Sequence, residues 1–123
     1  MIRGTLIAES LRLNESLDRV PLAVSKITRV GPLENLRPDQ PTVWTFVEFT
    51  ADDGHASDLA QSLAQVLDAA LGWYCDFRSD EETFVVFSQR VFRYRRGDPE
   101  GRAVAAEYAR KVGVPDSQID WPE

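Results

Sequence analysis

Three alternating residues in the second half of the chain have the chemistry of a small binding or catalytic site. If residues 73–78 form a strand, Tyr74, Asp76 and Arg78 share one face and Cys75 lies on the other. In a concave site, the Asp76 carboxylate accepts hydrogen bonds and the Arg78 guanidinium holds an anion. The alternative is a solvated strand face with a weak local ion pair.

A second segment, residues 42–50, places a carboxylate between aromatic and polar neighbours. It is rich in β-branched and aromatic residues, which is typical of a strand. Alternation puts Trp44, Phe46 and Glu48 on one face. If this strand is a neighbour of the first one, Glu48 lies near Asp76. The candidate binding residues are therefore Trp44, Phe46, Glu48, Tyr74, Asp76 and Arg78.

The lone cysteine and the lone histidine have structural explanations that we favour over catalytic ones. Cys75 lies on an apolar strand face, where a thiol behaves as a small buried hydrophobe and not as a reactive thiolate. His55 follows two aspartates in a turn before a helix, so we expect a solvated turn residue and not an acid or base.

Basic and aromatic residues alternate between Arg90 and Arg96. Such a strand can present rings that stack on bases beside guanidiniums that bind phosphate. In the alternative, the arginines face water while Phe92 and Tyr94 face the core. We favour this alternative because the chain as a whole is acidic.

The common catalytic and cofactor motifs are absent from the sequence. It contains no G-x-G-x-x-G, no phosphate-binding loop, no G-x-S-x-G and no H-E-x-x-H. One cysteine and one histidine cannot supply a zinc ligand set, and a single cysteine forms no internal disulfide. We therefore expect no metal and no cofactor.

Charge and hydropathy limit the partners and the location that we expect for this chain. The formal net charge is −6, which argues against nucleic acid as the main partner. No segment reaches the length of a signal peptide's apolar core or of a membrane span. We expect a cytoplasmic protein without a membrane contact.

Local patterns predict one α+β domain over residues 1–123, with the order β-β-β-α-β-β-β-α. The predicted strands cover residues 5–13, 22–30, 42–50, 73–78, 83–87 and 91–95. A helix follows from an apolar stripe that runs from Leu59 to Ala70, and a second helix begins after Asp98 as its cap. An irregular loop with three prolines covers about 31–41, and a tail covers 115–123, where Ile119 and Trp121 are expected to attach it to the domain.

The expected architecture is a mainly antiparallel sheet of five to six strands with both helices on one face. From residue 42 onward the order resembles a ferredoxin-like split β-α-β arrangement with an added hairpin, in topology only. The other face would then present Trp44, Phe46 and Tyr74, with Phe84 or Phe92 as further candidates. Either the N-terminal hairpin covers these rings, or a partner does.

These observations leave three hypotheses for function. The first is a non-enzymatic binding or protein-interaction domain that uses the aromatic sheet face for a second copy, a protein partner or a small ligand. The second is a small cofactor-free enzyme with Glu48, Asp76 and Arg78 in a pocket. The third is a nucleic-acid binder that uses the strand between Arg90 and Arg96.

Overall fold

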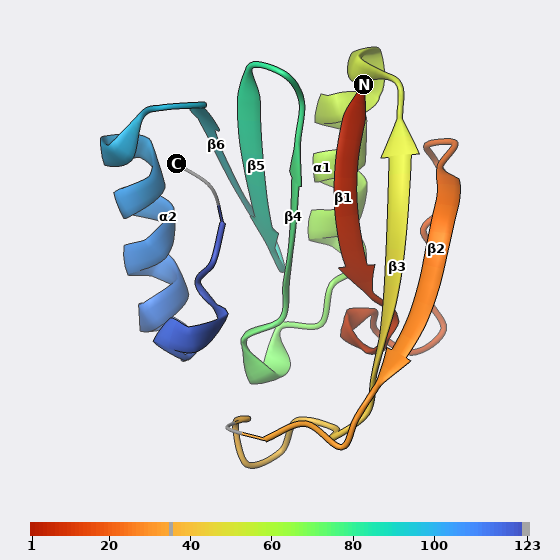
Figure 1. The fold of residues 1–123 in the computed structure, drawn as a ribbon, viewed down its shortest axis with the longest axis vertical. Coiled ribbons are helices and arrows are strands. Elements are labelled where there is room, and N and C mark those ends of the chain that lie inside the picture. Colours follow the sequence, from red (N-terminus) through yellow and green to blue (C-terminus); the bar gives the residue numbers. More distant parts are fainter. Residues whose placement is uncertain (35, 122–123) are drawn as a thin grey trace.

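The computed structural model describes residues 1–34 and 36–121, and this part contains one six-stranded sheet and two α-helices (Figure 1). The strands are β1 (Ile2–Ile7), β2 (Ala23–Val30), β3 (Trp44–Ala51), β4 (Tyr74–Arg78), β5 (Glu82–Phe87) and β6 (Arg90–Arg95). The helices are α1 (Ala56–Val66) and α2 (Pro99–Lys111). Asn35 in the predicted loop and residues 122–123 of the predicted tail lie outside the described residues.

The strand order β2-β3-β1-β4-β5-β6 confirms an α+β fold with an antiparallel sheet. Because β1 is antiparallel to both β3 and β4, these two strands run parallel to each other. They are joined through α1 and separated by β1, which is the split β-α-β arrangement expected from residue 42 onward. The resemblance to a ferredoxin-like fold is not confirmed beyond this unit.

The first strand begins and ends earlier than residues 5–13. Chain direction changes at a 3-10 turn of residues Ala8–Ser10, where the Ser10 hydroxyl donates to the Ile7 carbonyl at 2.6 Å. The hydroxyl thus takes up a backbone acceptor that a continuing ladder would need. Leu13, which the alternation placed in the strand, is 92% exposed.

The two helices lie on opposite faces of the sheet, so the expectation of both on one face was wrong. Leu63 of α1 belongs to a core with Phe84, whereas Ala105 of α2 belongs to a core with Val85 and Phe87. Successive residues of β5 point to opposite faces, so the two cores lie on either side of the sheet. A strand that is apolar on both faces needs cover on both, and this is the physical reason for the arrangement.

Helix α2 begins where the sequence predicts, whereas α1 ends earlier than predicted. Asp98 caps α2 as predicted, with its carboxylate accepting from the Gly101 backbone N–H at 3.1 Å. A Cβ at Gly101 would lie 2.4 Å from the Tyr94 Cβ, so glycine lets α2 approach β6 closely. By contrast, α1 ends at Val66, before the predicted end of its apolar stripe, because the chain becomes extended at Leu67.

The face on which α2 packs is divided into two halves. Helix α2 and the C-terminal segment cover the part formed by β5 and β6, which we call the closed half (Figure 1). The part formed by β2, β3, β1 and the near edge of β4 carries no α-helix among the described residues, and we call it the open half. Within the described residues, no helix is long and apolar enough to cross a membrane.

Candidate binding groove on the open half of the sheet

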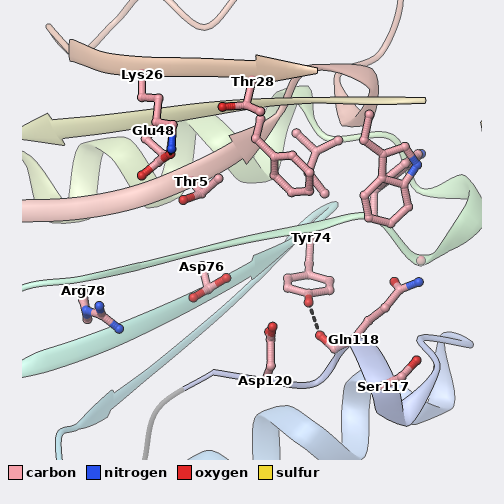
Figure 2. A pocket seen from close by; sticks show the side chains of 15 residues that line it. Thr5, Lys26, Thr28, Glu48, Tyr74, Asp76, Arg78, Ser117, Gln118 and Asp120 are labelled. Carbon is pink, nitrogen blue, oxygen red and sulfur yellow. Dashed lines mark hydrogen bonds and ion pairs between the residues drawn. The ribbon is translucent and has the colours of Figure 1, made fainter. Parts of the chain in front are cut away.

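A groove with a volume of about 650 Å³ lies over the open half of the sheet. Its floor comes from β2, β3, β1 and β4, and the C-terminal segment forms one wall (Figure 2). All six residues that the sequence singled out line it: Trp44, Phe46, Glu48, Tyr74, Asp76 and Arg78. Alternation alone identified these residues, and the tertiary structure brings the two sets into one groove.

Strand pairing aligns the groove side chains in rows across the sheet. An apolar row joins Phe46 to Ile7 and is bordered by Thr28. The next row is charged and consists of Lys26, Glu48, Thr5 and Asp76. A basic row follows, in which Arg3 lies directly opposite Arg78. The three rows place aromatic, acidic and basic groups in succession along the groove.

The strand order corrects one expectation about the carboxylates. Glu48 and Asp76 do not lie on neighbouring strands, because β1 separates β3 from β4. Thr5 pairs with Glu48 on one side and with Asp76 on the other, so the hydroxyl lies between the two carboxylates. Lys26 Nζ lies 4.0 Å from the Glu48 carboxylate, which gives Glu48 a basic partner on the far side from Asp76.

Trp44 at the aromatic end is covered by its own chain. It is 7% exposed, its ring lies 5.2 Å from that of Trp73, and its indole N–H donates to the Pro41 carbonyl at 2.8 Å. The N-terminal strands lie in the sheet and do not fold across this face. Phe46 is only half-buried, and its ring lies 6.2 Å from Trp44. Phe46 is therefore the ring on β3 that a ligand can reach.

The two further aromatic candidates lie elsewhere. Phe84 is buried on the α1 face, where it stacks on Phe77 with 4.7 Å between ring centroids. Phe92 packs against Phe87 and Tyr108 in the closed half. Neither ring contributes to the groove, because β5 turns Phe84 to the opposite face and α2 covers Phe92.

The start of β3 is held by Glu9, a residue that the sequence analysis did not single out. Its carboxylate accepts from the Thr45 backbone N–H at 2.6 Å and from the Thr45 hydroxyl at 2.8 Å. Burial acts to raise the pKa of Glu9, but these hydrogen bonds outweigh it and lower the pKa below its ordinary value. Glu9 thereby anchors the strand between Trp44 and Phe46.

The C-terminal segment forms a wall of the groove because four contacts attach it. The Tyr74 hydroxyl donates to the Gln118 carbonyl, and the Tyr74 ring lies 5.7 Å from the buried Trp121 ring. Arg102 of α2 donates to the Trp121 carbonyl at 3.0 Å and to the Ile119 carbonyl at 3.3 Å. The expected attachment of the tail through Trp121 is confirmed.

This attachment places Asp120 beside Asp76 (Figure 2). Burial, and to a smaller extent the Asp120 carboxylate, raise the pKa of Asp76, whereas Arg78 opposes them, and together they place this pKa at about 6. Within the described residues, neither carboxylate has an ion pair or a side-chain hydrogen bond to another residue. Asp76 is therefore a half-buried acid with spare hydrogen-bonding capacity and a charge that changes near pH 6.

The groove residues that sequence reasoning missed come from β1, β2 and the tail. They are Thr5, Ile7, Lys26, Thr28, Ser117, Gln118 and Asp120, together with Gly72 and Trp73. One signal was present for Asp120, because it lies between the two residues expected to attach the tail. No local signal showed that the attached tail would reach β4.

The lone cysteine and the lone histidine lie outside the groove. Cys75 is fully buried on the α1 face, its Sγ lies 3.5 Å from the Thr5 carbonyl, and burial raises its pKa. His55 lies at the start of α1 and is half-buried. Among the described residues, no group of three or more His, Cys, Asp or Glu side chains is placed to hold a metal ion.

The basic strand β6 shows the alternating arrangement that we favoured. Tyr94 is buried and Phe92 packs on α2, while Arg93 points to the other face and forms a two-point ion pair with Glu82. Arg90 lies over the Phe92 ring at 5.1 Å. The rings of β6 are therefore occupied by the protein itself and not open for stacking on bases.

Comparison of the chain with protein-family models, with curated proteins and with solved structures gave no match. The geometry of the groove is therefore the basis for any functional assignment. Its chemistry is that of a recess with one accessible aromatic wall, hydroxyl groups and two carboxylates that have no ion-pair partner in the described part of the chain.

Proposed function

We propose that this protein is a binding domain that takes a small organic molecule in the groove on the open half of its sheet. The observation that carries this proposal is a recess of about 650 Å³ in which Phe46 and Tyr74 lie beside a few convergent polar groups. Sites for small molecules are typically recesses of about 300–1,000 Å³ with this mixture of apolar walls and few polar groups.

A small ligand fits the groove better than a second copy of the chain or a protein partner. An interface centre is usually a broad apolar surface with few charges. Here the most apolar candidate, Trp44, is already covered by Trp73, and a charged row that includes Glu48 and Asp76 borders Phe46 directly. The remaining accessible aromatic area suits an apolar fragment and is too small and too charged for a stable interface.

The proposal is tested by a fragment screen that is monitored by protein NMR. We expect several compounds to shift the backbone signals of β3, β1 and β4 around Phe46 and to leave α1 unchanged. Phe46→Ala should remove these shifts. Val104→Ala is the matched control, because Val104 is 57% exposed on α2, away from the groove, and its truncation should leave binding intact.

Two results would contradict the binding function. One is that no compound shifts the groove signals at concentrations of about 10 mM, the range in which small fragments bind proteins. The other is a dimer in sizing experiments that Phe46→Ala dissociates, which would assign the same surface to self-association.

One observation favours a second candidate, a cofactor-free enzyme with Asp76 as its acid or base. A pKa raised to about 6 by burial is the type of shift found in groups that transfer protons near neutral pH. Ligands from the screen should be incubated with the protein and followed for chemical change. Conversion that Asp76→Asn abolishes would favour the enzyme, and recovery of unchanged ligand favours the binding domain.

A further inference from the structure

The order of charged residues along the groove indicates which charge its ligand carries. On β4, Asp76 lies between Tyr74 and Arg78, and all three side chains are on the same face. On β3, Glu48 is likewise the next groove residue after Phe46. On both strands the aromatic residue is therefore followed first by a carboxylate. A polar group attached to an apolar body on these rings meets acids before it meets bases.

Some charged side chains of the groove have an ion-pair partner of their own, and others have none within the described residues. Lys26 and Glu48 lie 4.0 Å apart and partly neutralise each other. Asp76 and Asp120 approach each other from β4 and from the C-terminal segment (Figure 2). Neither has an ion pair within the described part of the chain. Two neighbouring carboxylates that lack an ion pair among the described residues create a negative potential beside the Tyr74 ring.

The basic row of Arg3 and Arg78 does not make the aromatic end of the groove suitable for an anion. Arg3 and Arg78 lie opposite each other one row beyond Thr5 and Asp76, in a hollow of about 320 Å³ that continues the groove. An anion bound between these guanidiniums would have to lay its apolar body across Glu48 and Asp76 in order to reach Phe46. Desolvation of those carboxylates against an apolar body would oppose such a pose.

We propose that the ligand of this groove is a small organic cation, with its amine or quaternary ammonium group between Asp76 and Asp120 and its apolar body between Phe46 and Tyr74. This inference rests on the proposed binding function and adds the charge class of the ligand. A primary amine donates hydrogen bonds to the two carboxylates, and the Tyr74 ring face attracts a cation in addition. The Thr5 hydroxyl is a further acceptor in the same row.

The test uses three probes with the same phenyl body and different charges. These are 2-phenylethylamine as the cation, 2-phenylethanol as the neutral compound and 3-phenylpropionate as the anion, titrated at pH 7.5 and monitored by protein NMR. We expect the amine to bind about fivefold more tightly than the alcohol, because it gains partly exposed charge interactions with two carboxylates. The anion should bind more weakly than the alcohol.

Single-charge variants locate the cation. Asp76→Asn and Asp120→Asn should each weaken amine binding by about three- to tenfold and weaken alcohol binding less, because the alcohol carries no charge. Asp58→Asn is the control for net charge, because Asp58 is an exposed acid in the first turn of α1 on the opposite face of the sheet, and it should leave both affinities unchanged. Circular dichroism checks that each variant is folded.

The results separate this inference from the proposed function. Equal binding of amine and alcohol at the groove, tighter binding of the anion, or loss of amine binding in Asp58→Asn to the same extent as in Asp76→Asn would overturn the cation proposal while the binding function stands. Absence of groove shifts with all three probes would overturn the cation proposal, and the same absence throughout the fragment screen would overturn the binding function as well.

Discussion

The closed and open halves of one sheet face differ in what the strands present to it. In the closed half, Val85 and Phe87 of β5 and Tyr94 of β6 are buried beneath the small residues of α2. In the open half, a half-buried Phe46 adjoins a row that includes Glu48 and Asp76. The two halves belong to a single hydrogen-bonded sheet, so backbone pairing does not explain the difference.

The difference shows where stability and candidate function are located. Apolar side chains that pack between sheet and helix contribute most of the free energy of folding. Burial raises the pKa of Asp76, so its ionised carboxylate makes the folded state less stable at neutral pH. The open half therefore contains at least one residue that does not stabilise the fold. Departures of this kind from what favours stability are typical of binding and catalytic sites.

The largest expected effect comes from the closed half. Phe87→Ala should lower the free energy of unfolding by about 3–5 kcal/mol, the usual penalty for removing a buried phenylalanine. The Phe87 ring lies 4.9 Å from Tyr108, 5.8 Å from Tyr74 and 5.9 Å from Phe92, so truncation leaves a cavity among three rings. Urea denaturation measures the effect, and a loss below about 1 kcal/mol would mean that α2 does not pack as the structure shows.

The next effect is a gain in stability in the open half. The pKa of Asp76 is raised from its ordinary value of 3.8 to about 6, so between these pH values the folded protein binds more protons than the unfolded chain. The contribution of protonated Asp76 is therefore complete below about pH 4 and is lost as the pH rises to about 6. Asp76→Asn should raise the free energy of unfolding by about 1–3 kcal/mol at pH 8.

A pH series of denaturation curves provides the control for this prediction. The difference between Asp76→Asn and the wild type should be close to zero at pH 3.5 and should grow until about pH 6. A variant that is less stable than the wild type at pH 8 would show that the ionised carboxylate is satisfied in the folded state. Asp76 would then be a structural residue, contrary to the contrast between the halves.

A smaller loss is expected for the ring at the groove. Phe46→Ala should lower the free energy of unfolding by about 1 kcal/mol, because the ring is only half-buried and its removal leaves no closed cavity. The comparison with Phe87→Ala in the same urea experiment tests the division into halves directly. If both truncations cost the same, the open half is ordinary core and the groove is not a recess for a ligand.

The smallest effect is expected at the outer face of β6. Arg93→Ala removes an exposed ion pair with Glu82, so the loss should be about 0.2–1 kcal/mol and should shrink in 1 M NaCl. The Phe84 ring, which lies 5.1 Å from the Arg93 guanidinium, stays buried in the variant. A loss that exceeds about 2 kcal/mol would show that Arg93 covers the α1 core and is more than a surface charge.

The sequence by itself determined which side chains share a face. Alternation requires Tyr74, Asp76 and Arg78 to point to one side of a strand whatever its neighbours are, and the same rule joins Phe46 to Glu48. The cap of α2 at Asp98 and the attachment of the tail through Trp121 were also readable, because each depends on the residue type and its immediate context. The continuous apolar run of β5 also indicates cover on both faces of the sheet.

Only the tertiary structure decided how the residues of different strands and of the tail come together in the groove. The position of β1 between β3 and β4, which puts Thr5 between Glu48 and Asp76, depends on pairing between segments far apart in the sequence. The choice of sheet face for each helix depends on which apolar surface is still uncovered, and that is a property of the assembled sheet. The contact of the tail with β4, which brings Asp120 to Asp76, has the same origin, because local periodicity contains no information on where an attached segment ends.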